Sequence, residues 1–182
     1  MKLPAWLLVL SVLAVSAPSG MCQEARQTVK ALPRFYEVAP GVYRGGQPTR
    51  EGFILLKERG IRTVINLREG RNERGLVEGL GMKYVYIPVD PWRRVPASAI
   101  QTFLATVSDP ANHPVFVHCR RGADRTGFMI GAYRIAHQGW SAKQAYAEAR
   151  ALGMRWWFRG LKRQLREFAE QNAALRPSPA GR

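Results

Sequence analysis

One stretch constrains the fold of this chain more than any other: VHCRRGADRTG, at positions 117–127. It overlaps PVFVHC (114–119), an apolar and β-branched run typical of a buried strand, and it leads into an apolar stretch at 126–137 that suits a buried helix. A strand, a tight loop containing Gly122 and a helix N-terminus direct successive backbone amides towards one point. The segment therefore predicts an anion-binding loop between a strand and a helix.

Strand and helix patterns alternate along the rest of the chain. Further strands are predicted at 42–46, 61–67 and 82–89, where β-branched and aromatic residues gather. Helices are predicted from Thr49 to Gly60, within 68–81, from Ser98 onwards, and as three helices in the C-terminal third, one of them opened by a Ser141–Gln144 capping box. This alternation is typical of an α/β layer structure.

The length of 182 residues suffices for one domain with a hydrophobic core but not for two ordinary ones. Residues 1–22 have the pattern of a signal peptide, because Lys2 precedes an apolar run that ends in small and turn-forming residues. That run is too short to predict a membrane span, although a lipid anchor at Cys22 is an alternative. We expect a linker at 23–34, the folded domain at 35–175 and a disordered tail at 176–182.

The chain is strongly basic, with 28 Lys and Arg against 13 Asp and Glu and a formal charge of +15. Such a balance favours anionic partners: phosphorylated small molecules, acidic proteins, nucleic acid or an anionic membrane surface. The basic residues of 150–182 fit solvated helix faces and a tail better than a nucleic-acid patch. We therefore expect no nucleic-acid partner, keep an anionic membrane surface as a candidate contact, and expect a monomer.

Only two cysteines are present, and Cys22 lies at the signal junction, so no structural disulfide is expected. Loop amides and a helix dipole next to Cys119 would lower the pKa of its thiol from about 8.5 to roughly 3.5–7.5. Cys119 is therefore predicted to be a nucleophile at neutral pH. The alternative, an inert thiol in the core, leaves Gly122, Arg125 and Thr126 unexplained.

The residues after Cys119 supply the partners that a bound oxyanion needs. The planar fork of Arg125 can hold two phosphate oxygens, which Lys cannot reproduce. Thr126 can donate its hydroxyl to the departing sulfur, and His118 is expected to order the loop by hydrogen bonding. Arg120 and Arg121 either read additional phosphates or are merely solvated. Substrate contacts are predicted along the whole loop, from Arg120, Arg121, Gly122, Ala123, Asp124 and Arg125.

These residues resemble the Cys-x5-Arg phosphatases, in particular the dual-specificity and tyrosine phosphatases, with His118-Cys119 before the loop and Arg125-Thr126-Gly127 after it. The similarity extends to VYRGGQP (42–48), TVINLR (63–68), YIPVDPW (86–92) and YRIAHQGWS (133–141). Together with the export signal, it looks most like the periplasmic dual-specificity phosphatases of Gram-negative bacteria. The resemblance implies a single α/β domain: a central, mostly parallel sheet of about four to five strands, flanked by helices, with a helical C-terminal third.

The resemblance also implies an activity, the hydrolysis of phosphate monoesters through a phosphocysteine, without metal or cofactor. Phosphotyrosine proteins are the expected substrates, with phosphoserine and phosphothreonine proteins beside them. One alternative applies the same chemistry to an inositol phosphate or a phospholipid head group. Another is a catalytically silent module that captures phosphorylated ligands. A sulfurtransferase or an arsenate reductase fits the RTG sequence and the context of Asp90 poorly.

Family members use an upstream Asp to protonate the leaving oxygen and then to activate water. Asp90, directly after the 82–89 strand, matches that position and is the predicted general acid. Asp124 is the alternative acid, because some relatives have an Asp before the loop Arg. It could instead only pair with Arg120 or Arg121. Separately, the aromatic run Trp156, Trp157 and Phe158 is expected to serve packing rather than ligand binding.

Overall fold

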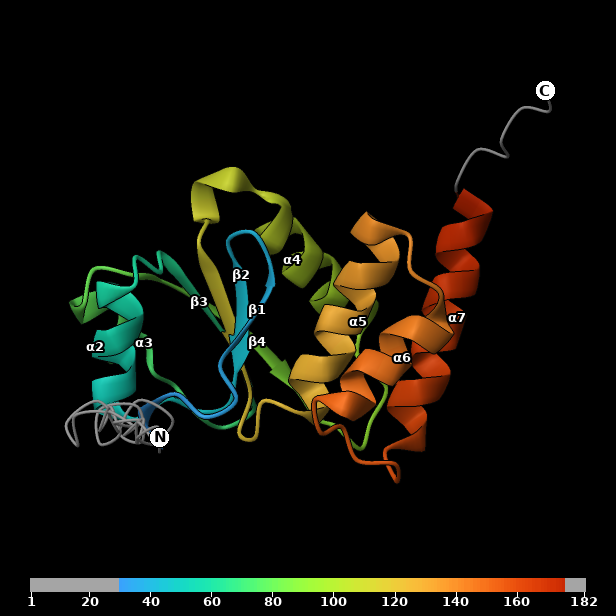
Figure 1. Ribbon diagram of the computed structural model, residues 1–182, viewed down its shortest axis with the longest axis horizontal. Helices are drawn as coiled ribbons and strands as arrows, with labels where there is room; N and C mark the ends of the chain where they lie inside the picture. Colours follow the sequence, from blue (N-terminus) through green and yellow to red (C-terminus); the bar gives the residue numbers. More distant parts are fainter. Residues whose placement is uncertain (1–29, 176–182) are drawn as a thin grey trace, which may run out of the picture.

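A five-stranded sheet runs through the middle of the molecule, for which a computed structural model describes residues 30–175 (Figure 1). The strands are β1 (Tyr36–Ala39), β2 (Val42–Gly45), β3 (Thr63–Arg68), β4 (Lys83–Val89) and β5 (Val115–His118). Their order in the sheet is β1-β2-β5-β3-β4. Only β1 is antiparallel to its neighbour. The predicted mostly parallel sheet is confirmed, whereas β1, a short and half-exposed edge strand, was not predicted.

The helices begin and end close to the positions that the sequence indicates. They are α2 (Arg50–Glu58), α3 (Arg74–Gly79), α4 (Ala97–Ser108), α5 (Asp124–Gln138), α6 (Ala142–Ala151) and α7 (Arg159–Leu175), with a 3-10 turn at Pro110–Asn112. The side chain of Thr49 caps α2 by accepting a hydrogen bond from the amide of Gly52. Ser141 and Gln144 form both bonds of the predicted capping box.

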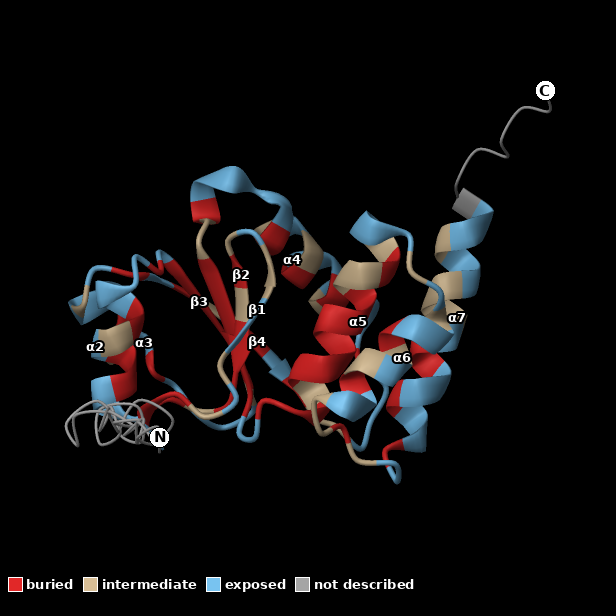
Figure 2. Cartoon of the chain, viewed as in Figure 1, coloured by how far each residue is buried: buried red, intermediate tan, exposed pale blue. Residues whose placement is uncertain are grey.

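The helices cover both faces of the sheet, α2 and α3 on one side and α4 to α7 on the other (Figure 1). Alternate residues of each central strand therefore enter different cores. In β5, Phe116 packs with the α2 side, whereas Val115 and Val117 pack with the α5 side. Figure 2 shows that burial is continuous through the sheet and into α5, which is buried on most of its surface, as predicted.

The parallel strands all end at one edge of the sheet, the lower edge in Figure 1. The connections after Gly45, Arg68, Val89 and His118 therefore meet there. In open α/β sheets this carboxyl edge is where ligands bind. The loop that contains Cys119 lies in its centre, because β5 is between β2 and β3.

The packed domain begins earlier than predicted. Ala31 and Leu32 are buried, and the Ala31 carbonyl accepts a hydrogen bond from the amide of Thr49. The end of the predicted 23–34 linker is therefore part of the fold, since its apolar residues pack beside α2. The predicted signal peptide, the start of the linker and the predicted tail lie outside the described residues. Among residues 30–175, no helix is long and apolar enough to cross a bilayer.

Candidate active site

The predicted strand, loop and helix are confirmed, because residues 119–123 join β5 directly to α5. Gly122 makes this tight connection possible, with a φ of 68° that side chains rarely adopt. A Cβ at Gly122 would collide with the backbone of Gly45 and Gly46. The amide of Gln47 also donates to the Arg120 carbonyl, 3.3 Å away. The turn after β2 therefore packs against the loop that contains Cys119.

Cys119 is 2 % exposed and its thiol forms no disulfide. Burial raises the pKa of this thiol, but the neighbouring hydroxyl and amide of Thr126 lower it. The charge of Arg125 and the amide of Arg121 act in the same direction, and together these effects hold the pKa of Cys119 below its ordinary value. The role of Thr126 as a hydroxyl donor to the sulfur stays a prediction.

A cavity of about 550 Å³ opens above the sulfur, and we call it the phosphate pocket. It is lined by Pro91, Trp92, Cys119, Arg120, Arg121, Asp124, Arg125, Arg155 and Phe158. Four of these side chains are guanidinium groups and one is a carboxylate, so the pocket favours anions. Gly122 and Ala123 are not among the lining residues. A larger hollow of about 780 Å³ lies beside the starts of α2 and α3, but it contains no thiol.

Arg125 connects the phosphate pocket to two strand ends. One terminal nitrogen donates long hydrogen bonds to the carbonyls of Leu67, at 3.4 Å, and Val89, at 3.3 Å. Within residues 30–175 its other guanidinium nitrogens have no protein hydrogen-bond partner. Arg125 is therefore positioned by β3 and β4 while keeping donors for an oxyanion.

Asp90 follows Val89 at the end of β4, next to the strand end that Arg125 contacts. Its carboxylate accepts a hydrogen bond of 2.9 Å from the amide of Trp92 and lies 3.6 Å from Nε of Arg93. Its side chain is 32 % exposed. The following residues, Pro91 and Trp92, line the phosphate pocket, although Asp90 itself does not. Asp90 is thus next in sequence to two residues that line the pocket, and its role as acid stays a prediction.

Asp124 is buried and bound to a residue that the sequence analysis did not consider. Its carboxylate accepts hydrogen bonds from the backbone amide of Arg155 at 2.8 Å, and from Nε and a terminal nitrogen of that side chain at 3.1 and 2.8 Å. The expected pairing with Arg120 or Arg121 is therefore wrong, since the first turn of α5 faces the connection between α6 and α7. Asp124 holds Arg155 at the phosphate pocket.

The expected hydrogen bond from His118 to the loop is also absent from the contacts of residues 30–175. Strand alternation directs His118 to the α2 side, where its Nε2 lies 3.3 Å from a carboxylate oxygen of Glu73. Burial raises the pKa of Glu73, but the adjacent His118 ring, the hydrogen bond from Gln47 and the charge of Arg68 outweigh burial and lower it. Gln47 in turn accepts from Arg68 at 2.6 Å. His118 therefore belongs to a buried polar chain behind the loop.

Arg44 is a second residue that sequence reasoning missed. It is fully buried in β2, and a terminal nitrogen donates a 2.8 Å hydrogen bond to the carbonyl of Gly122. Burial lowers the pKa of Arg44 to about 10, despite the opposing charges of Glu148 and Cys119. Nε and the other terminal nitrogen have no hydrogen-bond partner among the described residues. Arg44 therefore places a buried positive charge behind the phosphate-binding loop.

The predicted packing role of the aromatic run is correct only for Phe158, which is 3 % exposed. Trp156 and Trp157 are 58 % and 44 % exposed. The physical reason is that the α6–α7 connection turns at the surface and can bury only one of the three adjacent side chains.

The chain is similar to several known proteins in sequence and in fold. A relative from Arabidopsis thaliana, "Inositol diphosphatase DSP3", is 32 % identical over 130 residues, which are 67 % of this chain and 64 % of the relative, slightly under two thirds of its length. The crystal structure of P. aeruginosa TpbA has the same fold, with a TM-score of 0.65 at 22 % identity over 77 % of this chain and 91 % of that chain. The catalytic core of the S. cerevisiae "PP-IP phosphatase SIW14" gives a TM-score of 0.62 at 26 % identity, over 79 % and 94 %.

The family model described as "DSP-PTPase phosphatase fused to NAD+ Kinase" matches residues 27–159, which include every predicted site residue from Asp90 to Thr126. That match covers more than half of the chain and contains the strand, loop and helix around Cys119. The chain therefore belongs to the DSP-PTPase family of cysteine-dependent phosphatases.

Proposed function

We propose that this chain hydrolyses phosphate monoesters through a covalent phosphocysteine on Cys119. The observation that carries the proposal is the setting of the thiol: it lies at the phosphate pocket, among four guanidinium groups, with its pKa lowered. A thiolate next to an anion-binding loop is a nucleophile placed at a bound phosphate.

In the first step, the Cys119 thiolate attacks phosphorus and the bond from phosphorus to the ester oxygen breaks. The leaving oxygen takes a proton from Asp90. Arg125 and the loop amides hold the remaining phosphoryl oxygens, on which negative charge is concentrated. The products of this step are the free alcohol or phenol and phosphocysteine.

In the second step, water attacks phosphorus and gives its proton to the Asp90 carboxylate. The bond from phosphorus to sulfur breaks, inorganic phosphate leaves and the thiolate is restored. In this proposal the Thr126 hydroxyl donates to the departing sulfur and stabilises the negative charge that returns to it. The chain's own residues thus supply nucleophile, acid, base and charge stabilisation.

Phosphotyrosine proteins, with phosphoserine and phosphothreonine proteins beside them, are the first substrate class that we propose. Two aromatic side chains, Trp92 and Phe158, line the phosphate pocket with ring centroids 4.5 Å apart and ring planes tilted by 51°, and such aromatic lining suits a phenyl phosphate. A solved relative with the same fold, P. aeruginosa TpbA, was crystallised in complex with pTyr.

Inositol phosphates are a second candidate class, favoured by a different observation. Arg120, Arg121 and Arg155 line the pocket in addition to Arg125, which is more positive charge than one phosphate needs. Several relatives are inositol diphosphatases by name. A silent binding module accounts less well for the lowered pKa of Cys119.

We further propose that the chain is exported to the periplasm, acts as a monomer and contacts an anionic membrane surface. The pattern of residues 1–22 supports export, and the formal charge of +15 supports attraction to an anionic surface.

The decisive experiment compares Cys119→Ser with Cys22→Ser, the same substitution at the other cysteine. Hydrolysis of phosphotyrosine peptides, phosphoserine peptides and inositol phosphates is measured for both variants. Cys119→Ser should lose turnover of every substrate and still bind phosphate, because the loop amides and Arg125 remain. Retention of more than a few per cent of wild-type activity by Cys119→Ser contradicts the covalent mechanism. The relative rates on the three substrates decide between the two classes.

A further inference from the structure

Three exposed tryptophans lie near the phosphate pocket, and one of them, Trp92, lines it. Trp92 is 73 % exposed, Trp156 58 % and Trp157 44 %. Their rings form a continuous chain through Phe158: Trp92 lies 4.5 Å and Trp157 6.4 Å from the Phe158 ring, and Trp156 lies 5.8 Å from Trp157. We call Trp92, Trp156 and Trp157 the tryptophan rim. Adjacent exposed large aromatic side chains mark an interaction surface rather than a folding requirement.

Positive charge adjoins the tryptophan rim. The guanidinium of Arg155 lies 5.1 Å from the ring centre of Trp157, and that of Arg159 lies 5.8 Å from Trp156. Beside them is a groove of about 620 Å³, which we call the basic groove. It is lined by Tyr146, Trp156, Arg159, Lys162, Arg163 and Arg166, together with the backbone at the start of α7.

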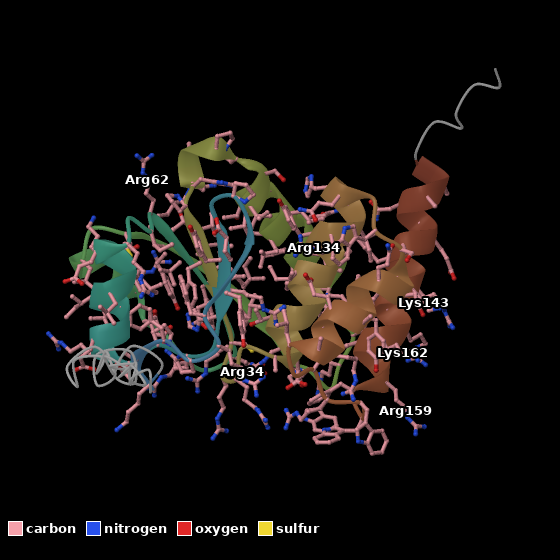
Figure 3. The ribbon with its side chains drawn as sticks, viewed as in Figure 1. Arg34, Arg62, Arg134, Lys143, Arg159 and Lys162 are labelled. Carbon is pink, nitrogen blue, oxygen red and sulfur yellow. The ribbon has the colours of Figure 1, made fainter. Side chains whose placement is uncertain are left out.

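The basic groove contains no acidic lining residue. Arg163 and Arg166 make long, exposed ion pairs of 3.8 Å with glutamates one turn further along α7. Arg159 and Lys162 have no carboxylate partner among residues 30–175, and Figure 3 shows both side chains at the surface near the lower edge of the molecule. Two cations of the groove are thus available to external anions.

The same surface adjoins the catalytic pocket. Three residues that line the phosphate pocket connect it to the tryptophan rim. Trp92 is itself part of the rim, and Arg155 and Phe158 contact Trp157. The exposed connection between α6 and α7 lies at the lower edge, at which the parallel strands end (Figure 2). A flat partner that contacts the tryptophan rim therefore also lies across the pocket entrance.

Tryptophan beside arginine and lysine is the combination that the surface of an anionic bilayer attracts. Tryptophan rings settle at head-group depth, with the apolar ring towards the acyl chains and the N–H towards water. Each Lys or Arg near an anionic leaflet adds further attraction. A protein partner would have to place several carboxylates against Arg159 and Lys162, whereas an anionic leaflet presents phosphates everywhere.

We propose that the tryptophan rim and the basic groove seat this enzyme on an anionic bilayer, with the phosphate pocket facing the lipid head groups. The surface then delivers phosphate monoesters carried on lipids to Cys119. The second part of this proposal rests on the proposed phosphatase function, whereas the binding surface does not.

The test uses the full chain and vesicles of phosphatidylcholine with or without 30 mol% phosphatidylglycerol, in a sedimentation assay. Trp156→Ser/Trp157→Ser and Arg159→Gln/Lys162→Gln are the test variants, because these residues do not line the phosphate pocket. Tyr36→Ser, an exposed aromatic on β1, and Arg62→Gln, an exposed arginine shown in Figure 3, are the matched controls. The segment 1–22 is identical in all variants, so its own affinity for lipid cancels in the comparison.

Wild type and both controls should bind the anionic vesicles at least tenfold more strongly than either test variant does. They should also bind anionic vesicles more strongly than they bind zwitterionic vesicles. Turnover of soluble nitrophenyl phosphate should stay the same in the tryptophan variant, whereas turnover of phosphatidic acid in vesicles should fall with binding. Unchanged vesicle binding by both test variants overturns the surface. The proposal is also overturned if free inorganic phosphate at millimolar concentration abolishes vesicle binding, because binding of single phosphate anions then explains the result.

Two further outcomes separate the surface from the proposed function. If wild type binds the vesicles through these residues but hydrolyses no phosphate monoester, the surface stands and the catalytic proposal fails. If binding of polyglutamate depends on the same residues and vesicle binding does not, the partner is an acidic protein and the bilayer proposal is wrong. Circular dichroism and thermal unfolding of each variant exclude misfolding as the cause of a loss.

Discussion

Replacing Arg44 by Met should separate the stability of this protein from its proposed activity. Arg44 is fully buried, and burial lowers its pKa to about 10. At pH 7 the guanidinium is charged in both the folded and the unfolded chain. Because its pKa is lower in the folded chain than in the unfolded chain, the buried charge destabilises the folded state by about 3 kcal/mol. The cost persists up to about pH 10 and disappears as the pH rises further, because the guanidinium then loses its proton in the folded chain. Methionine removes this cost, because it fills much of the same space without charge.

The same substitution removes the 2.8 Å hydrogen bond to the Gly122 carbonyl. Leaving a buried carbonyl unsatisfied costs about 1–3 kcal/mol. The two terms nearly cancel, so the free energy of unfolding at pH 7 should change by less than about 2 kcal/mol. The phosphate-binding loop, however, loses its anchor. If the about 1–3 kcal/mol lost with this hydrogen bond is also lost from the stabilisation of the transition state, kcat/KM falls about 5- to 150-fold.

The assay combines urea unfolding at pH 7 with kcat/KM for nitrophenyl phosphate. Arg62→Met, which removes an exposed arginine far from the loop, is the matched control and should change neither quantity. A destabilisation well above 3 kcal/mol with normal turnover of the folded fraction would show that Arg44 supports the fold rather than the loop. Unchanged stability together with unchanged turnover would refute the reasoning altogether.

Four of the five remaining predictions concern the site, and the fifth concerns export. Asp90→Asn should reduce turnover of alkyl phosphates and phosphotyrosine far more than that of nitrophenyl phosphate, because a good leaving group departs without a proton. Asp124→Asn should instead weaken substrate affinity with little dependence on the leaving group, because it releases Arg155; leaving-group sensitivity confined to the Asp124 variant would reverse the assignment. Iodoacetate should inactivate the protein by alkylating Cys119 well below pH 8, because the lowered pKa of the thiol keeps the thiolate present at a lower pH than in a free cysteine. Phosphate should protect against this inactivation. An alkylation midpoint near pH 8.5, about that of a free thiol, would contradict the loop geometry. Arg125→Lys should be nearly as inactive as Cys119→Ser, because an ammonium cannot make the bidentate contact, and near-normal kcat/KM would disprove that role. Residues 1–30 fused to a reporter should direct it out of the cytoplasm, and a cytoplasmic reporter would disprove the export proposal.

The sequence alone determined the strand, loop and helix around Cys119. Gly122, Arg125 and Thr126 lie within seven residues of the thiol, so their positions follow from local geometry once β5 and α5 form. The parallel strands and both helix caps could be predicted for the same reason: hydrophobic period and capping are properties of neighbouring residues. The short strand β1 could not, because only its pairing with β2 defines it.

Only the tertiary structure decided which distant side chains complete the site. Arg44 reaches Gly122 across 78 positions and Arg155 reaches Asp124 across 31, and both contacts depend on how the sheet and helices pack. The direction of His118 depends on which core lies behind each face of β5. Whether Trp156 and Trp157 are buried depends on the space left by α5 and α7. Local sequence patterns do not encode these contacts, because each is created by surfaces that meet only after the chain has folded.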